Sequence, residues 1–227
     1  MGELSKIQFL AVAALPILFA ITVHEVAHGW VAKRLGDPTA MMMGRLTLNP
    51  IKHIDPIGTV ILPVLMLMTT GFLFGWAKPV PITWENLRNP KRDMGLVAIA
   101  GPAANLLMAL VWALVLKIAL FLPPAASNVG VPLVYMGFAG IFINTILMTL
   151  NLIPLPPLDG GRIVSSLLPG PLSWKYNRLE PFGLFILVIL LVTGILGKIL
   201  LPAIGLVMGA VSFLFGIDPK LLMMLGS

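Results

Sequence analysis

Apolar residues gather in six stretches, separated by segments rich in glycine, proline and charge. The stretches cover residues 7–32, 57–74, 94–122, 131–153, 182–200 and 203–217. A helix needs about 20 apolar residues to cross the hydrocarbon core of a bilayer. The first, third, fourth and fifth stretches are good candidates, and the other two are marginal. The pattern predicts an all-α polytopic membrane protein, a bundle of about five to six transmembrane helices.

The segments on either side of the second stretch have a different pattern. They read "GDPTAMMMGRLTLNPIKHIDP" and "GWAKPVPITWENLRNPKRD", and their Gly and Pro residues are typical of turns and short strands. We therefore expect a short membrane-associated β or re-entrant segment after the first helix, with 41–48 as its strand-like part. Since no long linker interrupts the chain, we expect one membrane-embedded domain over 1–227, with a core at about 7–168 and C-terminal helices at about 182–217.

Composition supports the membrane assignment and narrows the chemistry. Charged residues make up 11% of the chain and the mean hydropathy is +1.00, whereas charged residues run at about 25% in soluble domains. The chain has no cysteine, so a metal site must use His, Asp or Glu. The net charge of +6 comes without a basic helix or an aromatic-basic motif, which argues against nucleic acid as a partner. Basic loops facing the cytoplasm explain the charge instead.

The distribution of Lys and Arg predicts the orientation. Eight of the fifteen lie between residues 33 and 93, and none lies in the connection 123–131. By the positive-inside rule the first region is cytoplasmic and the second is not. We expect a multi-pass protein of a prokaryotic plasma membrane. The stretch 57–74 has basic loops on both flanks and contains Pro63. We therefore expect it to be re-entrant or interfacial and not to cross.

Two histidines and a glutamate interrupt the first apolar stretch in "TVHEVAHGW". His24 and His28 are four residues apart, so a helix places both rings on one face. That spacing lets both imidazoles bind one ion, with Glu25 beside them to take a proton from a water molecule. The alternative is a pair of buried histidines satisfied by backbone or hydroxyl groups. Because a carboxylate in lipid is costly, the metal interpretation is favoured.

A second polar motif, "NLIPLPPLDGGR", follows the fourth apolar stretch. Its three prolines must end the helix before Asp159. Asp159 is a candidate third metal ligand, and the alternative is the N-cap of a short helix 160–168. His53 could compete as third ligand, but it lies in a turn-rich basic loop and a turn role is favoured.

Topology couples the two motifs. The histidines lie near the end of the first crossing that meets Lys33 and Arg34. If 57–74 does not cross, then 94–122 leads away and 131–153 returns, which brings Asp159 to the same side. If 57–74 did cross, Asp159 would emerge on the opposite side and could not share the ion.

Together the motifs resemble the site-2 protease family of intramembrane zinc metalloproteases, peptidase family M50. The resemblance rests on His24-Glu25-x-x-His28, on the run from Asn151 to Gly160, and on "AGPAANLL" at 100–107, which is similar to a Gly-Pro-x-x-Asn core-helix motif. It covers about residues 7–168. Family members often carry PDZ or CBS domains, and this chain resembles a compact form without them.

The resemblance implies that His24, His28 and Asp159 bind Zn²⁺, that Glu25 is the catalytic acid/base, and that Asn151 hydrogen-bonds the substrate backbone. The implied enzyme is a zinc metalloendopeptidase that acts in regulated intramembrane proteolysis. Its partner would be a membrane protein whose transmembrane helix unwinds locally within the lipid bilayer. We expect extended backbone at 152–158 or 41–48 to pair with the unwound substrate as an added strand. The sequence sets no oligomeric state.

Two functions of other classes remain open. A metal or proton transporter also holds intramembrane His and carboxylate groups, but repeated halves would be expected and none is visible. A non-catalytic zinc-holding scaffold would have no need of Glu25.

Overall fold

The computed structural model describes residues 6–61 and 78–225. Within that part of the chain, four helices are long and apolar enough to cross a membrane. They are α1 (Lys6–Leu35), α4 (Pro90–Leu120), α5 (Ser127–Asn151) and α9 (Ile195–Phe215). The expected helical membrane protein is confirmed, with four such helices in the described residues and not the expected five to six.

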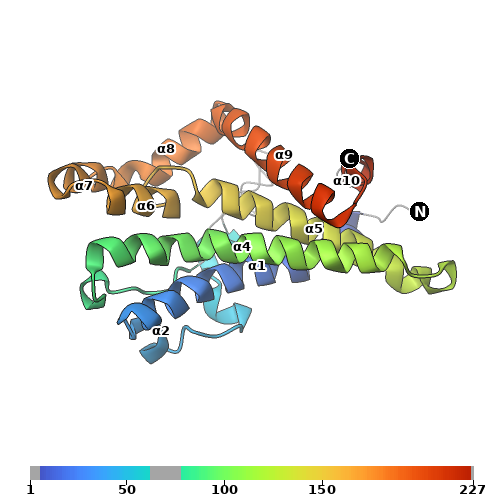
Figure 1. The fold of residues 1–227 in the computed structure, drawn as a ribbon, viewed down its shortest axis with the longest axis horizontal. Helices are drawn as coiled ribbons and strands as arrows, with labels where there is room; N and C mark the ends of the chain where they lie inside the picture. Colours follow the sequence, from blue (N-terminus) through green and yellow to red (C-terminus); the bar gives the residue numbers. More distant parts are fainter. Residues whose placement is uncertain (1–5, 62–77, 226–227) are drawn as a thin grey trace.

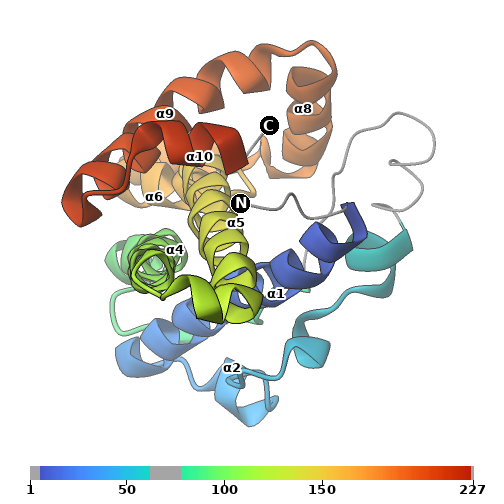
Figure 2. The ribbon, with the colours of Figure 1, turned by 90° about the vertical axis from the view of Figure 1, so that its right-hand side faces the viewer.

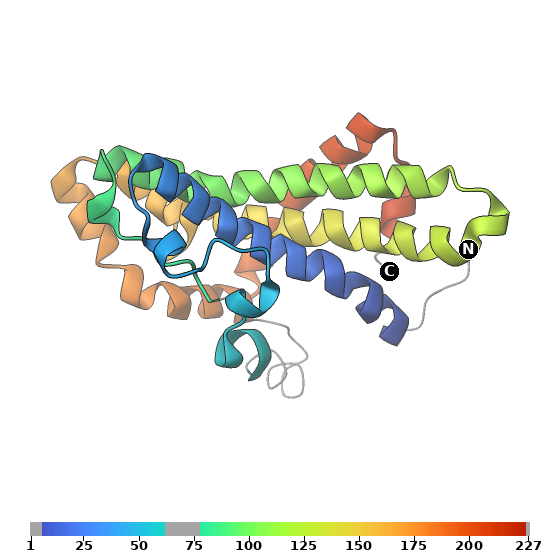
Figure 3. The ribbon, with the colours of Figure 1, turned by 90° about the horizontal axis from the view of Figure 1, so that it is seen from below.

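Helices α1, α4 and α5 pack against one another and form the core. Figure 1 shows α4 and α5 side by side along the long axis, and Figures 2 and 3 show α1 crossing both at an angle. Gly137 and Gly140 of α5 lie against Leu116 and Trp112 of α4, where an added Cβ would collide with the neighbour. Small residues of this kind let two membrane helices approach closely.

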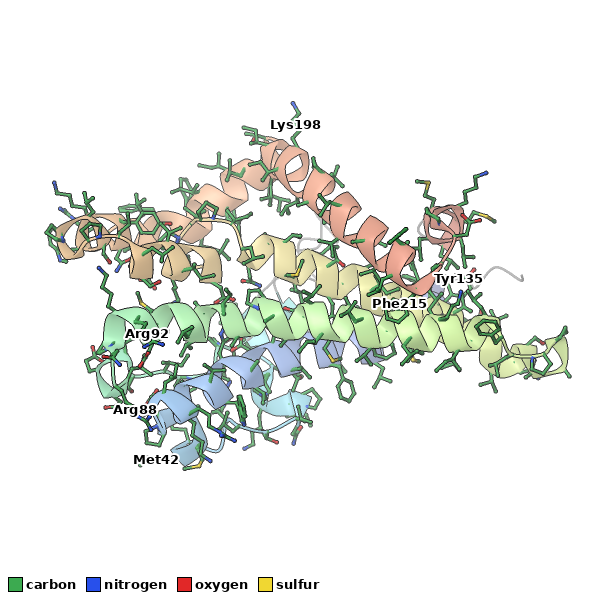
Figure 4. The ribbon with its side chains drawn as sticks, in the orientation of Figure 1. Met42, Arg88, Arg92, Tyr135, Lys198 and Phe215 are labelled. Carbon is green, nitrogen blue, oxygen red and sulfur yellow. The ribbon has the colours of Figure 1, made fainter. Side chains whose placement is uncertain are left out.

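One end of this bundle collects the segments that carry the two polar motifs. The C-terminal end of α1, the first turn of α4 and the end of α5 all lie there (Figure 1). Helix α1 ends at Leu35, and Gly36 follows with φ +116°, a conformation that glycine adopts without a Cβ clash. Figure 4 places Arg88 and Arg92 at this same end.

The segment after α1, residues 36–61, consists of short helices joined by turns. It contains α2 (Thr39–Met42), the 3₁₀ helix η1 (Pro50–His53) and the π-helical η2 (Pro56–Ile61). The described residues contain no strand, so the strand-like prediction for 41–48 is wrong. The buried Asp37 accepts the Thr39 N–H (3.1 Å) and starts a helical turn that local sequence pattern did not reveal. Residues 62–74 of the expected re-entrant stretch lie outside the described residues.

The proline-rich segment between α5 and α6 (Asp159–Leu167) folds into turns. Helix α5 ends at Asn151, before the prolines, as predicted. The N–H of Leu155 donates to the Ile153 carbonyl (2.8 Å), and the N–H of Leu158 donates to the Leu155 carbonyl (2.9 Å). These turns leave no extended edge at 152–158, so neither segment that we expected to pair with substrate has the form of a strand.

The C-terminal helices differ from the expected pair at 182–200 and 203–217. Helix α7 (Gly170–Asn177) leads into α8 (Glu180–Val192), and Gly194, with φ +73°, separates α8 from α9. The long apolar run therefore breaks at Gly194 and not near residue 201, since Pro202 is accommodated inside α9. Figure 1 shows α8 and α9 meeting at an apex away from the core, and Lys198 lies there in Figure 4. The remaining short helices are η3 (Trp84–Asn86), η4 (Pro124–Ala126) and α10 (Pro219–Leu225).

Candidate metal centre

The two histidines of α1 lie buried against α4, with their rings in contact. Their Nε2 atoms are 3.0 Å apart. Nδ1 of His24 donates to Oδ1 of Asn105 (2.6 Å), and Nδ1 of His28 donates to the Val97 carbonyl (2.8 Å). Because each Nδ1 carries the proton in these bonds, a neutral ring presents the lone pair of Nε2 to the other. Two lone pairs therefore point into one small space.

One face of α4 supports both rings. Val97, Gly101 and Asn105 are spaced four residues apart, so they lie in a row on that helix. An added Cβ at Gly101 would collide with the rings of His24 and His28. The glycine therefore makes room for both rings, and the residues one turn before and after it accept their Nδ1 protons.

The amide of Asn105 is itself fixed in orientation. Its Nδ2 donates to the Ala20 carbonyl (3.2 Å) and to Oδ1 of Asn144 (2.9 Å). Asn144 in turn donates to the Gly140 carbonyl (2.8 Å). Since the amide nitrogen of Asn105 has acceptors on α1 and α5, its oxygen must face His24.

Asp159 completes the group from a third element. It is the first residue of α6, and its Oδ2 lies 3.3 Å from Nε2 of both histidines. This buried oxygen has no hydrogen-bond donor among the described residues. The proline-containing turns before α6 thus direct the carboxylate at the histidines, and it does not cap the helix.

The three side chains fit a zinc ion. One ligand atom from each of His24, His28 and Asp159 lies within 4.8 Å of the other two. Ligand atoms held about 2.0–2.1 Å from a tetrahedral zinc stand roughly 3.3 Å apart, which matches the observed separations of 3.0 and 3.3 Å. When both rings are neutral, the two Nε2 atoms and the carboxylate oxygen of Asp159 all present lone pairs, and no proton lies between them. A cation at their centre would offset the repulsion between these lone pairs. Two imidazoles and one carboxylate form a donor set that zinc enzymes use with a fourth position open.

Glu25 lies next to this group on the adjacent face of α1. Its Oε2 accepts the backbone N–H of Val80 at 2.7 Å. Among the described residues it is not part of the cluster that could hold the metal. Its role in taking a proton from water stays a prediction.

The two other candidates lie elsewhere. His53 is buried in η1, and its Nε2 donates to the Thr47 carbonyl (2.9 Å), so it is not one of the grouped ligands. Asn151 is the last residue of α5, and its Nδ2 donates to the carbonyl of Leu147 (2.9 Å) in its own helix. Among the described residues it is not one of the three grouped side chains.

Sequence reasoning missed the contact between Asn105 and His24. Asn105 and Asn144 also tie helices together, since the amide of Asn105 links α4 to α1 and α5. The available signal was the spacing of Gly101 and Asn105, one turn apart and in register with the four-residue spacing of the histidines. Only the packing of α4 on α1 shows that the two spacings face each other.

The chain is similar in sequence to proteins named as zinc metalloproteases. The family model described as "Peptidase family M50" matches residues 12–194. The "Putative zinc metalloprotease YwhC" of Bacillus subtilis is 38% identical over 192 residues, which cover 83% of this chain and 84% of that protein. The "Putative zinc metalloprotease Rip2" of Mycolicibacterium smegmatis is 32% identical over 185 residues, covering 80% of this chain and 66% of that protein. No solved structure matches. The chain belongs to peptidase family M50.

Proposed function

We propose that this chain is an intramembrane zinc metalloendopeptidase of the site-2 protease type. Its reaction is the hydrolysis of a peptide bond within or near a transmembrane segment of another membrane protein, as regulated intramembrane proteolysis requires. The observation that carries the proposal is the convergence of His24, His28 and Asp159 at one end of an apolar bundle. The family supports the peptidase class, and the position of His24 and His28 within an apolar helix long enough to cross a membrane supports a substrate inside the bilayer.

Each residue has a separate chemical role. Zinc held by His24, His28 and Asp159 would supply an activated water nucleophile and polarise the scissile carbonyl. Glu25 would take the proton from the attacking water and pass it to the leaving amine. Asn105 and the Val97 carbonyl hold the two rings with Nε2 directed at the ion. Such supporting contacts fix the tautomer and orientation of ligand histidines.

The substrate must expose a peptide bond that a helix normally shields. A locally unwound transmembrane helix supplies one, because its backbone groups are then free of their intrahelical partners. Asn151 is the candidate contact for that backbone. Its amide nitrogen donates to the Leu147 carbonyl of its own helix, and its side-chain oxygen has the capacity to accept an N–H from the substrate.

The site would face the cytoplasm in the plasma membrane of a prokaryote. Lys33 and Arg34 lie in the last turn of α1, and Arg88 and Arg92 lie at the same end of the bundle (Figure 4). The positive-inside rule places such an end on the cytoplasmic side.

Cleavage of a tagged single-pass substrate tests the proposal. The substrate carries a helix-weakening Gly or Pro in the cytoplasmic half of its transmembrane segment, and wild type is compared with Glu25→Gln at equal zinc content. We expect cleavage by wild type, its loss on chelation, and a reduction of about 100-fold or more in Glu25→Gln. If neither protein cuts any of a panel of such substrates while both hold one zinc, the metal site has a transport or binding role.

A further inference from the structure

Residues 78–83, which we call the strap, pass over the face of α1 that carries Glu25. They form neither helix nor strand. Glu25 and Gly29 are one turn apart on this face, beside the face of His24 and His28. Val80 is buried, and an added Cβ at Gly29 would meet its side chain and that of Leu46. The strap is therefore packed directly on the catalytic turn of α1.

A buried arginine fixes the first end of the strap. One guanidinium nitrogen of Arg45 donates to the Lys78 carbonyl (2.9 Å) and lies 3.4 Å from the Pro79 carbonyl. The N–H of Lys78 donates to the His53 carbonyl (2.9 Å). Arg45 is 8% exposed, so its guanidinium makes these contacts away from solvent. Hydrogen bonds from a charged donor are stronger than those from a neutral one.

A buried aspartate fixes the other end. Asp37 accepts the backbone N–H of Thr83 (2.8 Å) and the side-chain amide of Asn86 (3.0 Å). It also accepts the N–H and the hydroxyl of Thr39. Asp37 lies two residues after α1, is fully buried, and its N–H donates to the Ala32 carbonyl of that helix (2.9 Å). It therefore ties the far end of the strap to the helix that carries Glu25.

The strap reaches the proposed catalytic machinery through a backbone hydrogen bond. The N–H of Val80 donates to Oε2 of Glu25 at 2.7 Å. Val80 lies between Pro79 and Pro81, which have no N–H and favour extended backbone at their neighbours. Val80 is therefore the residue of this triplet that can donate, and its conformation is restricted before the contact forms.

We infer that Val80 is a positioning residue for the proposed peptidase: its N–H, held in place by the clamped strap, fixes one carboxylate oxygen of Glu25. The other oxygen is then directed for proton transfer. The inference rests on the proposed function for its kinetic consequence. The contact itself is a property of the chain and can be measured without substrate.

Residue-resolved hydrogen exchange in detergent tests the contact. In Glu25→Ala we expect the Val80 amide to exchange about tenfold faster than in wild type, the factor that corresponds to 1.4 kcal/mol. The Thr83 N–H, which donates to Asp37, is the control within the same segment. We expect its exchange rate to be the same in both proteins. Equal Val80 rates in wild type and Glu25→Ala would overturn the inference.

Two substitutions at one position test the positioning role. Val80→Pro removes the N–H in a segment already restricted by prolines, and Val80→Ala keeps the N–H while losing the side chain. We expect kcat of Val80→Pro to be about tenfold or more below that of Val80→Ala, with KM within about twofold and equal zinc content, as loss of a transition-state interaction requires. If the kcat of Val80→Pro is within twofold of that of Val80→Ala at equal zinc content, Val80 has no positioning role.

The two readouts separate this inference from the proposed function. If wild type and Val80→Ala both cleave the substrate and only Val80→Pro is slow, both stand. If all three cleave equally, the peptidase stands and the positioning role of Val80 is wrong. If wild type cleaves nothing, the proposed function fails, and with it the kinetic role of Val80, while hydrogen exchange still reports whether the Glu25 contact forms.

Discussion

The glycines of the core and those of the C-terminal helix have opposite surroundings. An added Cβ at Gly101, Gly137 or Gly140 would collide with a neighbouring helix, whereas at Gly197, Gly205 or Gly209 in α9 it would meet no atom within 4 Å. The most apolar window of α5 is 56% buried and that of α9 is 11% buried. Helices of similar hydropathy can therefore differ completely in whether they build the site.

The match to the family follows the same division. It covers residues 12–194 and stops where α9 begins. The core helices carry both candidate histidine ligands and the groups that orient them, and α6 supplies Asp159. These contacts require close packing. In α9, Gly197, Gly205 and Gly209 have no neighbouring atom within 4 Å of an added Cβ. They lie on an apolar helix that lipid can cover. The difference teaches that close contact, and not apolar content, marks the functional part of this chain.

The largest expected effect comes from filling the space at Gly101. Gly101→Ala places a methyl group against both histidine rings, so we expect zinc affinity to fall by about 100-fold and the fold to lose about 1–3 kcal/mol from overpacking. Metal analysis and thermal unfolding in detergent measure both. Gly197→Ala is the matched control in α9, where unchanged zinc content is expected. Equal behaviour of the two variants would erase the contrast between core and α9.

A smaller effect is expected from the groups that orient the ligands. Asn105→Leu removes the acceptor of the His24 Nδ1 proton, so zinc affinity should fall by about 10–100-fold. Competition with a chelator measures it. Asn144→Leu, one hydrogen bond further from the ring, should cost less. A larger loss in Asn144→Leu than in Asn105→Leu would contradict the assigned role of Asn105.

The smallest effect concerns the buried carboxylate beside the core. Burial alone would raise the pKa of Asp37, but hydrogen bonds from Thr39, Asn86 and Thr83 outweigh it and hold the pKa below its usual 3.8. A lowered folded-state pKa contributes stability above the unfolded value, and this is lost as pH falls through the folded value. Asp37→Asn should therefore be less stable than wild type by about 1–2 kcal/mol at pH 6, with the gap narrowing below pH 3.8. Thermal unfolding of both proteins across pH 3–7 measures the gap, and a constant gap would be inconsistent with the assigned hydrogen bonds.

Regular features of the sequence predicted much of this molecule. The four-residue spacing of His24 and His28 and the proline break before Asp159 predicted the grouped ligands, because both are local constraints on backbone direction. Local pattern did not reveal that α4 would supply Asn105 to His24, since that contact depends on how two helices pack. It also gave a strand at 41–48, where the structure has the end of α2 at Met42 followed by turns. The break at Gly194 was missed because apolar residues continue on both sides of it.

Zinc K-edge X-ray absorption, combined with metal analysis of wild type and Asp159→Ala, tests the central claim most directly. The account predicts one zinc per wild-type chain with two imidazole nitrogens and a carboxylate oxygen at about 2.0–2.2 Å. In Asp159→Ala the carboxylate contribution should disappear and the zinc should be lost to a chelator more readily. A coordination sphere with three imidazoles, or one unchanged in Asp159→Ala, would contradict it.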